Sequence, residues 1–212
     1  MEAGQLKGTA REELVSLISS TTSWDRGVRD LLRYLGEDPD RDGLRETPRR
    51  IREAWQEWFS GYSIDIGRLF KTFEHESSQN DLVSVTDIPL YSQCEHHLLP
   101  FFGSAHIGYI PSGRVLGLSK LARVVRAFAS RLQMQERLTA MIADAIQENL
   151  TPKGVAVSLT CRHLCMEARG VRTPGTLTTT YAFRGCLVDQ QSAQRADFLA
   201  GIPRRSGAEF GR

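Results

Sequence analysis

Apolar residues recur with two different periods along this chain, and the order of these periods restricts the fold more than any other feature. Four segments have helical spacing: 24–36, 47–62, 117–132 and 135–150. Four others have strand patterns, with alternation or many β-branched residues: 82–92, 103–111, 155–167 and 176–185. Strands that follow one another in sequence usually pair directly. We therefore expect an α+β fold whose strands are mostly antiparallel.

Residues with known positional preferences mark the ends of these helices. Thr47 is a candidate N-cap, and Pro48 then takes the first helical position, where its missing N–H costs nothing. Gly36 ends the first helix, and Pro152 with Gly154 ends the fourth. These signals mark the start of the second helix and the ends of the first and the fourth.

The composition is that of an ordinary globular protein, with 41% hydrophobic and 25% charged residues. A net charge of +2 is too small to indicate a nucleic-acid partner, so any basic site must be local. The N-terminal segment lacks the apolar region of a signal peptide, and no run approaches the ~20 apolar residues of a membrane span. We expect a cytoplasmic protein whose four cysteines are reduced rather than paired.

The segment CEHH places Cys94, His96 and His97 within four positions of a chain that has only five histidines. A second group follows an apolar alternation in 155–165, where Cys161, His163 and Cys165 would project from one side of a regular strand. Two side chains from the first group and one later cysteine would give three ligands. Catalytic zinc sites have three protein ligands and keep the fourth position open for water.

Spacing alone leaves several alternatives open. It does not decide between His96 and His97, or between Cys161 and Cys165, as ligands. Buried cysteines often only pack, and packing is the preferred interpretation for Cys161 and Cys186.

Three long segments together resemble the GTP cyclohydrolase I family: CEHHLLPFFGSAHIGYIP, GLSKLARVVRAFASRLQMQERLT, and HLCMEARGV followed by a threonine-rich strand. The resemblance covers roughly residues 24–200 and includes ETPRRI and FLAGI. It implies the tunnelling fold, a four-stranded antiparallel sheet backed by two helices, with an N-terminal helical extension. It also implies that subunits join their sheets into a barrel and assemble into a decamer. The corresponding division is a flexible tail (1–20), a helical region (21–80), the catalytic domain (81–200) and a C-terminal tail (201–212).

The resemblance implies zinc-dependent conversion of GTP and water to formate and 7,8-dihydroneopterin triphosphate, at the start of pterin and folate biosynthesis. By its motifs, Cys94, His97 and Cys165 bind Zn²⁺, and His96 and His163 transfer protons. Zinc lowers the pKa of a bound water from about 16 towards about 7, which favours attack on carbon 8 of guanine. His163 is the candidate acid for nitrogen 7, and His96 suits the later proton transfers.

The same motifs imply the contacts to GTP. Glu136 matches the residue that binds guanine, with Gln135 as a further base contact, although Glu136 alone would suit a first-turn position beside the helix dipole. The residues matched to the triphosphate are Ser119, Lys120, Arg123, Arg169 and Arg50. Neighbouring subunits of the family complete each pocket, so an isolated monomer should be poorly active.

Two departures and two alternatives remain. Glu53 replaces a residue that is basic in some relatives, and Glu167 places a negative charge near the expected phosphate contacts. Another tunnelling-fold enzyme, such as the deazaguanine nitrile reductase, would use a cysteine nucleophile and a nicotinamide cofactor without zinc. A non-catalytic zinc protein would supply a fourth protein ligand and would not need His96 or His163.

Overall fold

The computed structural model describes residues 21–74 and 81–203, which fall into two units divided between Glu57 and Trp58. The first unit contains α2 (Thr21–Tyr34) and most of α3 (Thr47–Trp58). Trp24 joins these helices, because its indole N–H donates to the Pro48 carbonyl at 2.8 Å and its ring meets Trp55 edge-on. Both helices were predicted. The predicted division of the chain at residues 20, 80 and 200 stays a prediction.

The end of α3 lies earlier than the sequence predicted. The helix stops at Trp58, and the chain continues as a 3₁₀ turn, η1 (Ser60–Ser63). The Gly61 N–H donates to the carbonyl of Ser130 at 3.0 Å, and a Cβ on Gly61 would lie 2.1 Å from the Ala127 carbonyl. This close backbone contact, which periodicity does not reveal, takes the place of another helical turn.

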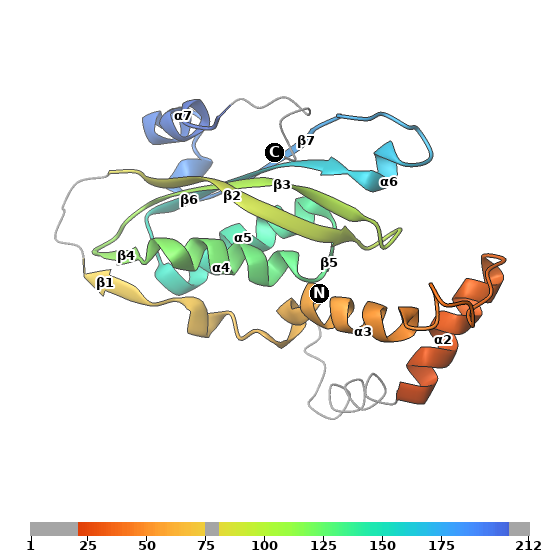
Figure 1. The fold of residues 1–212 in the computed structure, drawn as a ribbon. Helices are drawn as coiled ribbons and strands as arrows, with labels where there is room; N and C mark the ends of the chain where they lie inside the picture. The colour runs from red at the N-terminus through yellow and green to blue at the C-terminus, as the bar shows by residue number, and fades with distance from the viewer. Residues whose placement is uncertain (1–20, 75–80, 204–212) are drawn as a thin grey trace, which may run out of the picture. The chain divides into compact units, whose positions relative to one another are not determined.

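The second unit is built on a five-stranded sheet with the order β5-β2-β3-β6-β7 (Figure 1). Its four long strands pair antiparallel: β2 (Val83–Cys94), β3 (Pro100–Ile110), β6 (Gly154–His163) and β7 (Thr178–Gly185). The α+β class is therefore confirmed. The sequence missed the short β5 (Leu132–Gln133), which pairs in parallel with the end of β2, and the separate pair β1 (Thr72–Glu74) and β4 (Arg114–Leu116).

Two helices, α4 (Leu118–Ala129) and α5 (Gln135–Leu150), cover one face of the sheet (Figure 1). The alternation in β6 places Val155, Val157 and Leu159 in the core on this face, as predicted. A smaller apolar cluster on other residues of the strands includes Ala156 and Phe198, which belongs to α7 (Ala193–Ala200). Among the described residues, no helix combines the length and apolar character that a membrane span needs.

The strand pattern predicted for 155–167 is wrong at its end. β6 stops at His163, and the next residues form one helical turn, α6 (Leu164–Glu167), closed by the Ala168 N–H donating to the Leu164 carbonyl at 2.9 Å. The neighbouring strand explains this end, because β3 starts at Pro100, which has no N–H to continue the ladder, and its next residue, Phe101, pairs with His163. Cys165 therefore lies on α6 and not on the strand face.

A substitution at Gly103 tests whether the backbones of β3 and β6 approach as closely as the structure shows. A Cβ at this position would lie 2.0 Å from the Thr160 carbonyl oxygen. Because backbone atoms must move to admit it, we expect Gly103→Ala to lower the free energy of unfolding by about 1–3 kcal/mol or more in urea titrations. Gly67→Ala is the control, since its Cβ would make only ordinary contacts, at 3.5 Å and beyond. Equal effects of the two substitutions would contradict this account.

Candidate metal centre

Cys94 and His97 are brought together by the tight turn between β2 and β3. The Cys94 N–H donates to the Leu99 carbonyl at 2.9 Å, and the Cys94 carbonyl accepts from the Leu98 N–H at 2.8 Å. Leu98 takes a left-handed conformation, with φ of 54°, to close this turn. As a result the His97 Nδ1 lies 3.8 Å from the Cys94 Sγ.

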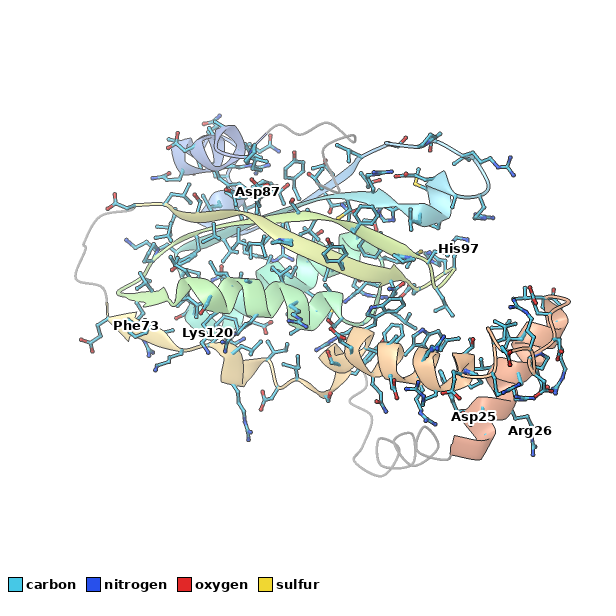
Figure 2. All side chains as sticks on the ribbon, viewed as in Figure 1. Asp25, Arg26, Phe73, Asp87, His97 and Lys120 are labelled. Atoms are coloured by element: carbon cyan, nitrogen blue, oxygen red, sulfur yellow. The ribbon has the colours of Figure 1, made fainter. Side chains whose placement is uncertain are left out.

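Cys165 approaches the same turn from α6. One donor atom from each of Cys94, His97 and Cys165 lies within 4.8 Å of the other two, although Cys165 is far from the others in sequence. Figure 2 shows His97 at the end of the sheet where β2 and β3 meet. Two thiols and an imidazole at this spacing form a donor set that could hold a metal, and one that suits zinc in particular.

The structure favours one of the two cysteines that spacing could not separate. Cys161 is completely buried in the core under the helices, and burial raises its thiol pKa, so it has the environment of a packing residue. Burial also raises the pKa of Cys165, and the adjacent Cys94 raises it further. A bound cation would stabilise the thiolate of Cys165, whose ionisation is disfavoured in this way.

The two histidines of the turn differ less clearly. His96 is exposed, and its Nδ1 lies 3.9 Å from the Cys94 Sγ, almost as close as that of His97. The compact group of three donors nevertheless contains His97. His96 lies beside the group, close enough for the proton transfers expected of it, and this role stays a prediction.

An ion pair that the sequence did not predict braces the turn. The guanidinium of Arg137, in the first turn of α5, binds the carboxylate of Glu95 and also donates to the Leu132 carbonyl at 3.1 Å. The hydrogen bond from Arg137 keeps the pKa of Glu95 below its usual value. Glu95, the residue between Cys94 and His96, therefore anchors the turn to β5 and α5.

His163 occupies the last position of β6 and is half-buried. Its ring stacks on Phe101, with centroids 4.7 Å apart and planes 6° apart, and its Nε2 lies 2.7 Å from the Gln135 Oε1. Burial lowers the pKa of His163, against the weaker opposing effect of the nearby carboxylates of Glu136 and Glu167. The adjacent Glu136, in the first turn of α5, is exposed.

Gln135 has an environment that the sequence did not indicate. It is only 2% exposed, and its Nε2 lies within hydrogen-bonding distance of the Leu159 carbonyl, the Thr178 carbonyl and the Thr180 hydroxyl. Its side-chain amide is therefore occupied by groups of the protein itself. A contact with the base remains a prediction for this residue.

The structure explains the acidic residue near the expected phosphate contacts. Glu167 accepts from Arg162 at 2.8 Å from Nε, and this bond is the main reason that the pKa of Glu167 is low. Arg162 therefore neutralises the charge that the sequence left unexplained. Arg169, two residues further, is exposed and donates to the Cys165 carbonyl at 3.3 Å.

The remaining predicted phosphate residues are not brought to this site within one chain. Ser119, Lys120 and Arg123 lie in the first half of α4, whose far end is held to β2 by the Ser92 hydroxyl donating to the Ala129 carbonyl. Lys120 is nine residues from Ala129, roughly 14 Å along the helix. Figure 2 shows Lys120 and His97 at opposite ends of this unit.

Two further residues named from the sequence, Arg50 and Cys186, lie outside this cluster, and the phosphate contact of Arg50 stays a prediction. Arg50 is exposed on α3 in the first unit, where Glu53 pairs with Arg49 at 2.9 Å. Cys186 was expected to pack in the core, and this is wrong, because it is exposed at the start of a 3₁₀ turn, η3 (Cys186–Val188). All four cysteines lie in the described part of the chain and are free thiols, as predicted.

Comparison with known proteins decides the family. Residues 24–202 match the GTP cyclohydrolase I family. The chain belongs to this family. It is 54% identical over 167 residues to the protein named GTP cyclohydrolase 1 of Janthinobacterium sp. (strain Marseille), covering 78% of this chain and 82% of that protein. It is 53% identical over 178 residues to that of Nitrosospira multiformis, covering 84% and 91%.

Among solved structures, the chain is similar to the archaeosine synthase QueF-Like in the apo form. The TM-score is 0.42 and the sequence identity 18%, over 51% of this chain and 97% of that one.

The matched pair Cys161 and Cys165 tests the assignment of the ligands. We expect Cys165→Ala to abolish stoichiometric binding of Zn²⁺, measured by elemental analysis after dialysis, because one of three donors is lost. Cys161→Ala should keep the metal and lose about 1 kcal/mol of stability, as a small core truncation does. Loss of metal from Cys161→Ala with retention in Cys165→Ala would reverse the assignment.

Proposed function

We propose that this protein is a zinc-dependent GTP cyclohydrolase, which converts GTP and water to 7,8-dihydroneopterin triphosphate and formate. The observation that supports this most directly is the convergence of Cys94, His97 and Cys165 within a chain that belongs to the family. The reaction would provide the first intermediate of pterin and folate biosynthesis.

Cys94, His97 and Cys165 would hold the metal. Their donor atoms come from two separate parts of the chain, and the ion pair between Glu95 and Arg137 keeps the turn that carries two of them in place. When bound, Zn²⁺ supplies a Lewis acid that makes a water molecule acidic enough to act as a nucleophile near neutral pH. A three-donor set leaves room for that water, which a fourth protein ligand would exclude.

His163 is the candidate acid that protonates nitrogen 7 of guanine and so makes carbon 8 more electrophilic. Its half-buried ring is held by Phe101 and Gln135, and it lies two residues before Cys165, which places it next to the metal group in sequence and on the same end of the sheet. His96 would serve the later proton transfers that accompany release of formate and rearrangement of the ribose.

Glu136 is the candidate for recognition of guanine. Its carboxylate is exposed, lies in the first turn of α5 and affects the protonation of His163, so it is near the proposed acid. A carboxylate can accept from both N1–H and the exocyclic amine of guanine, whereas adenine lacks this pair of donors.

The triphosphate would be bound by cations from more than one chain. Arg169 is close to Cys165, whereas Lys120 lies at the other end of the unit. We infer that one GTP molecule in contact with both groups takes Ser119, Lys120 and Arg123 from a neighbouring subunit. This arrangement supports a homo-oligomer, for which we propose the barrel-forming decamer of the family. Arg50 would add a further phosphate contact. We also propose that the enzyme acts in the cytoplasm.

Assay of purified, zinc-loaded protein with GTP tests the function directly. We expect formate and a pterin, fluorescent after oxidation, to form in equal amounts. His163→Ala should retain zinc and lose turnover by about 10²–10⁴-fold, the usual contribution of a general acid. Absence of formate from folded, zinc-loaded wild-type protein would refute the proposal. Normal turnover by His163→Ala would refute only the assignment of the acid.

Mixed oligomers test whether two chains build one site. His163→Ala and Lys120→Glu proteins should each be inactive alone. After the two proteins are dissociated and reassembled together, roughly a quarter of the sites should regain activity. Each site would take His163 from one chain and Lys120 from its neighbour, and random assortment makes both intact in about one site in four. Mixed oligomers verified by mass spectrometry that stay inactive would indicate that each site lies within one chain.

A further inference from the structure

The orientation of the Gln135 side-chain amide is determined by its surroundings. Its Nε2 lies 3.1 Å from the Leu159 carbonyl oxygen and 2.9 Å from the Thr178 carbonyl oxygen. Backbone carbonyls only accept hydrogen bonds, so the end of the amide that faces them must be the NH₂ group. The opposite end, which faces His163, must therefore be the carbonyl oxygen Oε1.

This orientation assigns the proton on His163. The Gln135 Oε1 only accepts, and it lies 2.7 Å from the His163 Nε2. A hydrogen bond at that distance requires the hydrogen to be on Nε2. In the neutral ring, Nδ1 then carries the lone pair.

Both partners in this bond are held firmly. Gln135 is 2% exposed, and the Thr139 hydroxyl donates to its backbone carbonyl at 2.6 Å while also meeting the Thr180 hydroxyl. The His163 ring lies flat against Phe101, a fully buried side chain, which limits rotation of the imidazole. A half-turn of the ring would put Cε1 in the place of Nε2 and would give up the bond to Gln135.

We propose that Gln135 is a positioning residue that holds the proton of His163 on Nε2 and leaves Nδ1 as the nitrogen that exchanges a proton with the substrate. The second half of this statement rests on the proposed function. It gives Gln135 a different part from the base contact expected from the sequence. The side chain acts on the substrate through His163.

The proton balance of this step is simple. To act as the acid, His163 must first take up a proton, so that both of its nitrogens carry hydrogens. The Nδ1 proton passes to nitrogen 7 of guanine, and the electron pair of the N–H bond stays on Nδ1. The Nε2–H group donates its hydrogen bond to the Gln135 Oε1 throughout, so the product is the neutral tautomer with its hydrogen on Nε2.

Nitrogen NMR of the wild-type protein tests the first half without any turnover. Zinc-loaded protein with ¹⁵N-labelled histidine is measured in the solid state at a pH where His163 is neutral, and His163→Asn identifies the signals. We expect a protonated, pyrrole-type shift for Nε2 and an unprotonated shift for Nδ1. The reverse pattern would overturn the assignment, whether or not the protein hydrolyses GTP.

Gln135→Met tests the second half, because methionine has a similar length and no acceptor of comparable strength. We expect kcat to fall by about 10-fold or more, because fewer His163 side chains would have the proton on the correct nitrogen for the transfer. KM for GTP should change by less than about 2-fold, because Gln135 would not contact the substrate itself. The ¹⁵N spectrum should then show both tautomers of His163. Gln147→Met, at the other end of α5, is the matched control and should leave kcat unchanged.

The outcomes separate the possible explanations. A raised KM or a lost preference for guanine, with the His163 tautomer unchanged, would identify Gln135 as a base contact and overturn the proposal. Unchanged kcat and spectrum would also overturn it. If Gln135→Met does not fold, the wild-type spectrum still decides the tautomer. If the wild-type protein produces no formate, the proposed function fails, and the tautomer result stands independently.

Discussion

The register between β3 and β6 is the constraint on which the candidate site depends. Phe101 pairs with His163, and Pro100, the first residue of β3, pairs with Gln93 of β2. These pairings place the end of β2, the start of β3 and the end of β6 at nearly the same level, so the turn after β2 and the helical turn after β6 begin at the same end of the sheet, on either side of β3. A change of register by one residue would reverse which face each side chain occupies and would separate Cys94 from Cys165.

The sequence predicts the elements of this fold better than their ends. The periods of two and of 3.6 residues identify four long strands and four helices because each buries one continuous face. The alternation in 155–165 continues smoothly to Cys165, yet the strand stops at His163, because its neighbour begins with a proline. β5 is two residues long, too short for any period, and forms only because α4 ends beside β2.

The sequence predicted which residues belong to the candidate site, but only partly how they are arranged in space. Cys94 and His97 are close in sequence, but their partnership with Cys165 rather than Cys161 depends on one being buried under the helices and the other lying on α6. Charge compensation was also invisible in the sequence. Glu167 looks unfavourable near the expected phosphate contacts until Arg162 is placed beside it, and nothing in the sequence indicates that Glu95 pairs with Arg137. The family resemblance gave the ligand set, which the residue pattern had left open.

The first turn of α5 links the two halves of the site. Consecutive helical residues point about 100° apart, so three neighbours can face three directions. Gln135 points inward to His163 at the end of β6, Glu136 is exposed, and Arg137 reaches Glu95 in the turn that carries Cys94 and His97. One helical turn thus holds the proposed acid and braces the turn that carries two of the candidate metal ligands. Since the helix is packed against the sheet along its length, the fold itself sets the position of its first turn, and the core thereby preorganises the arrangement.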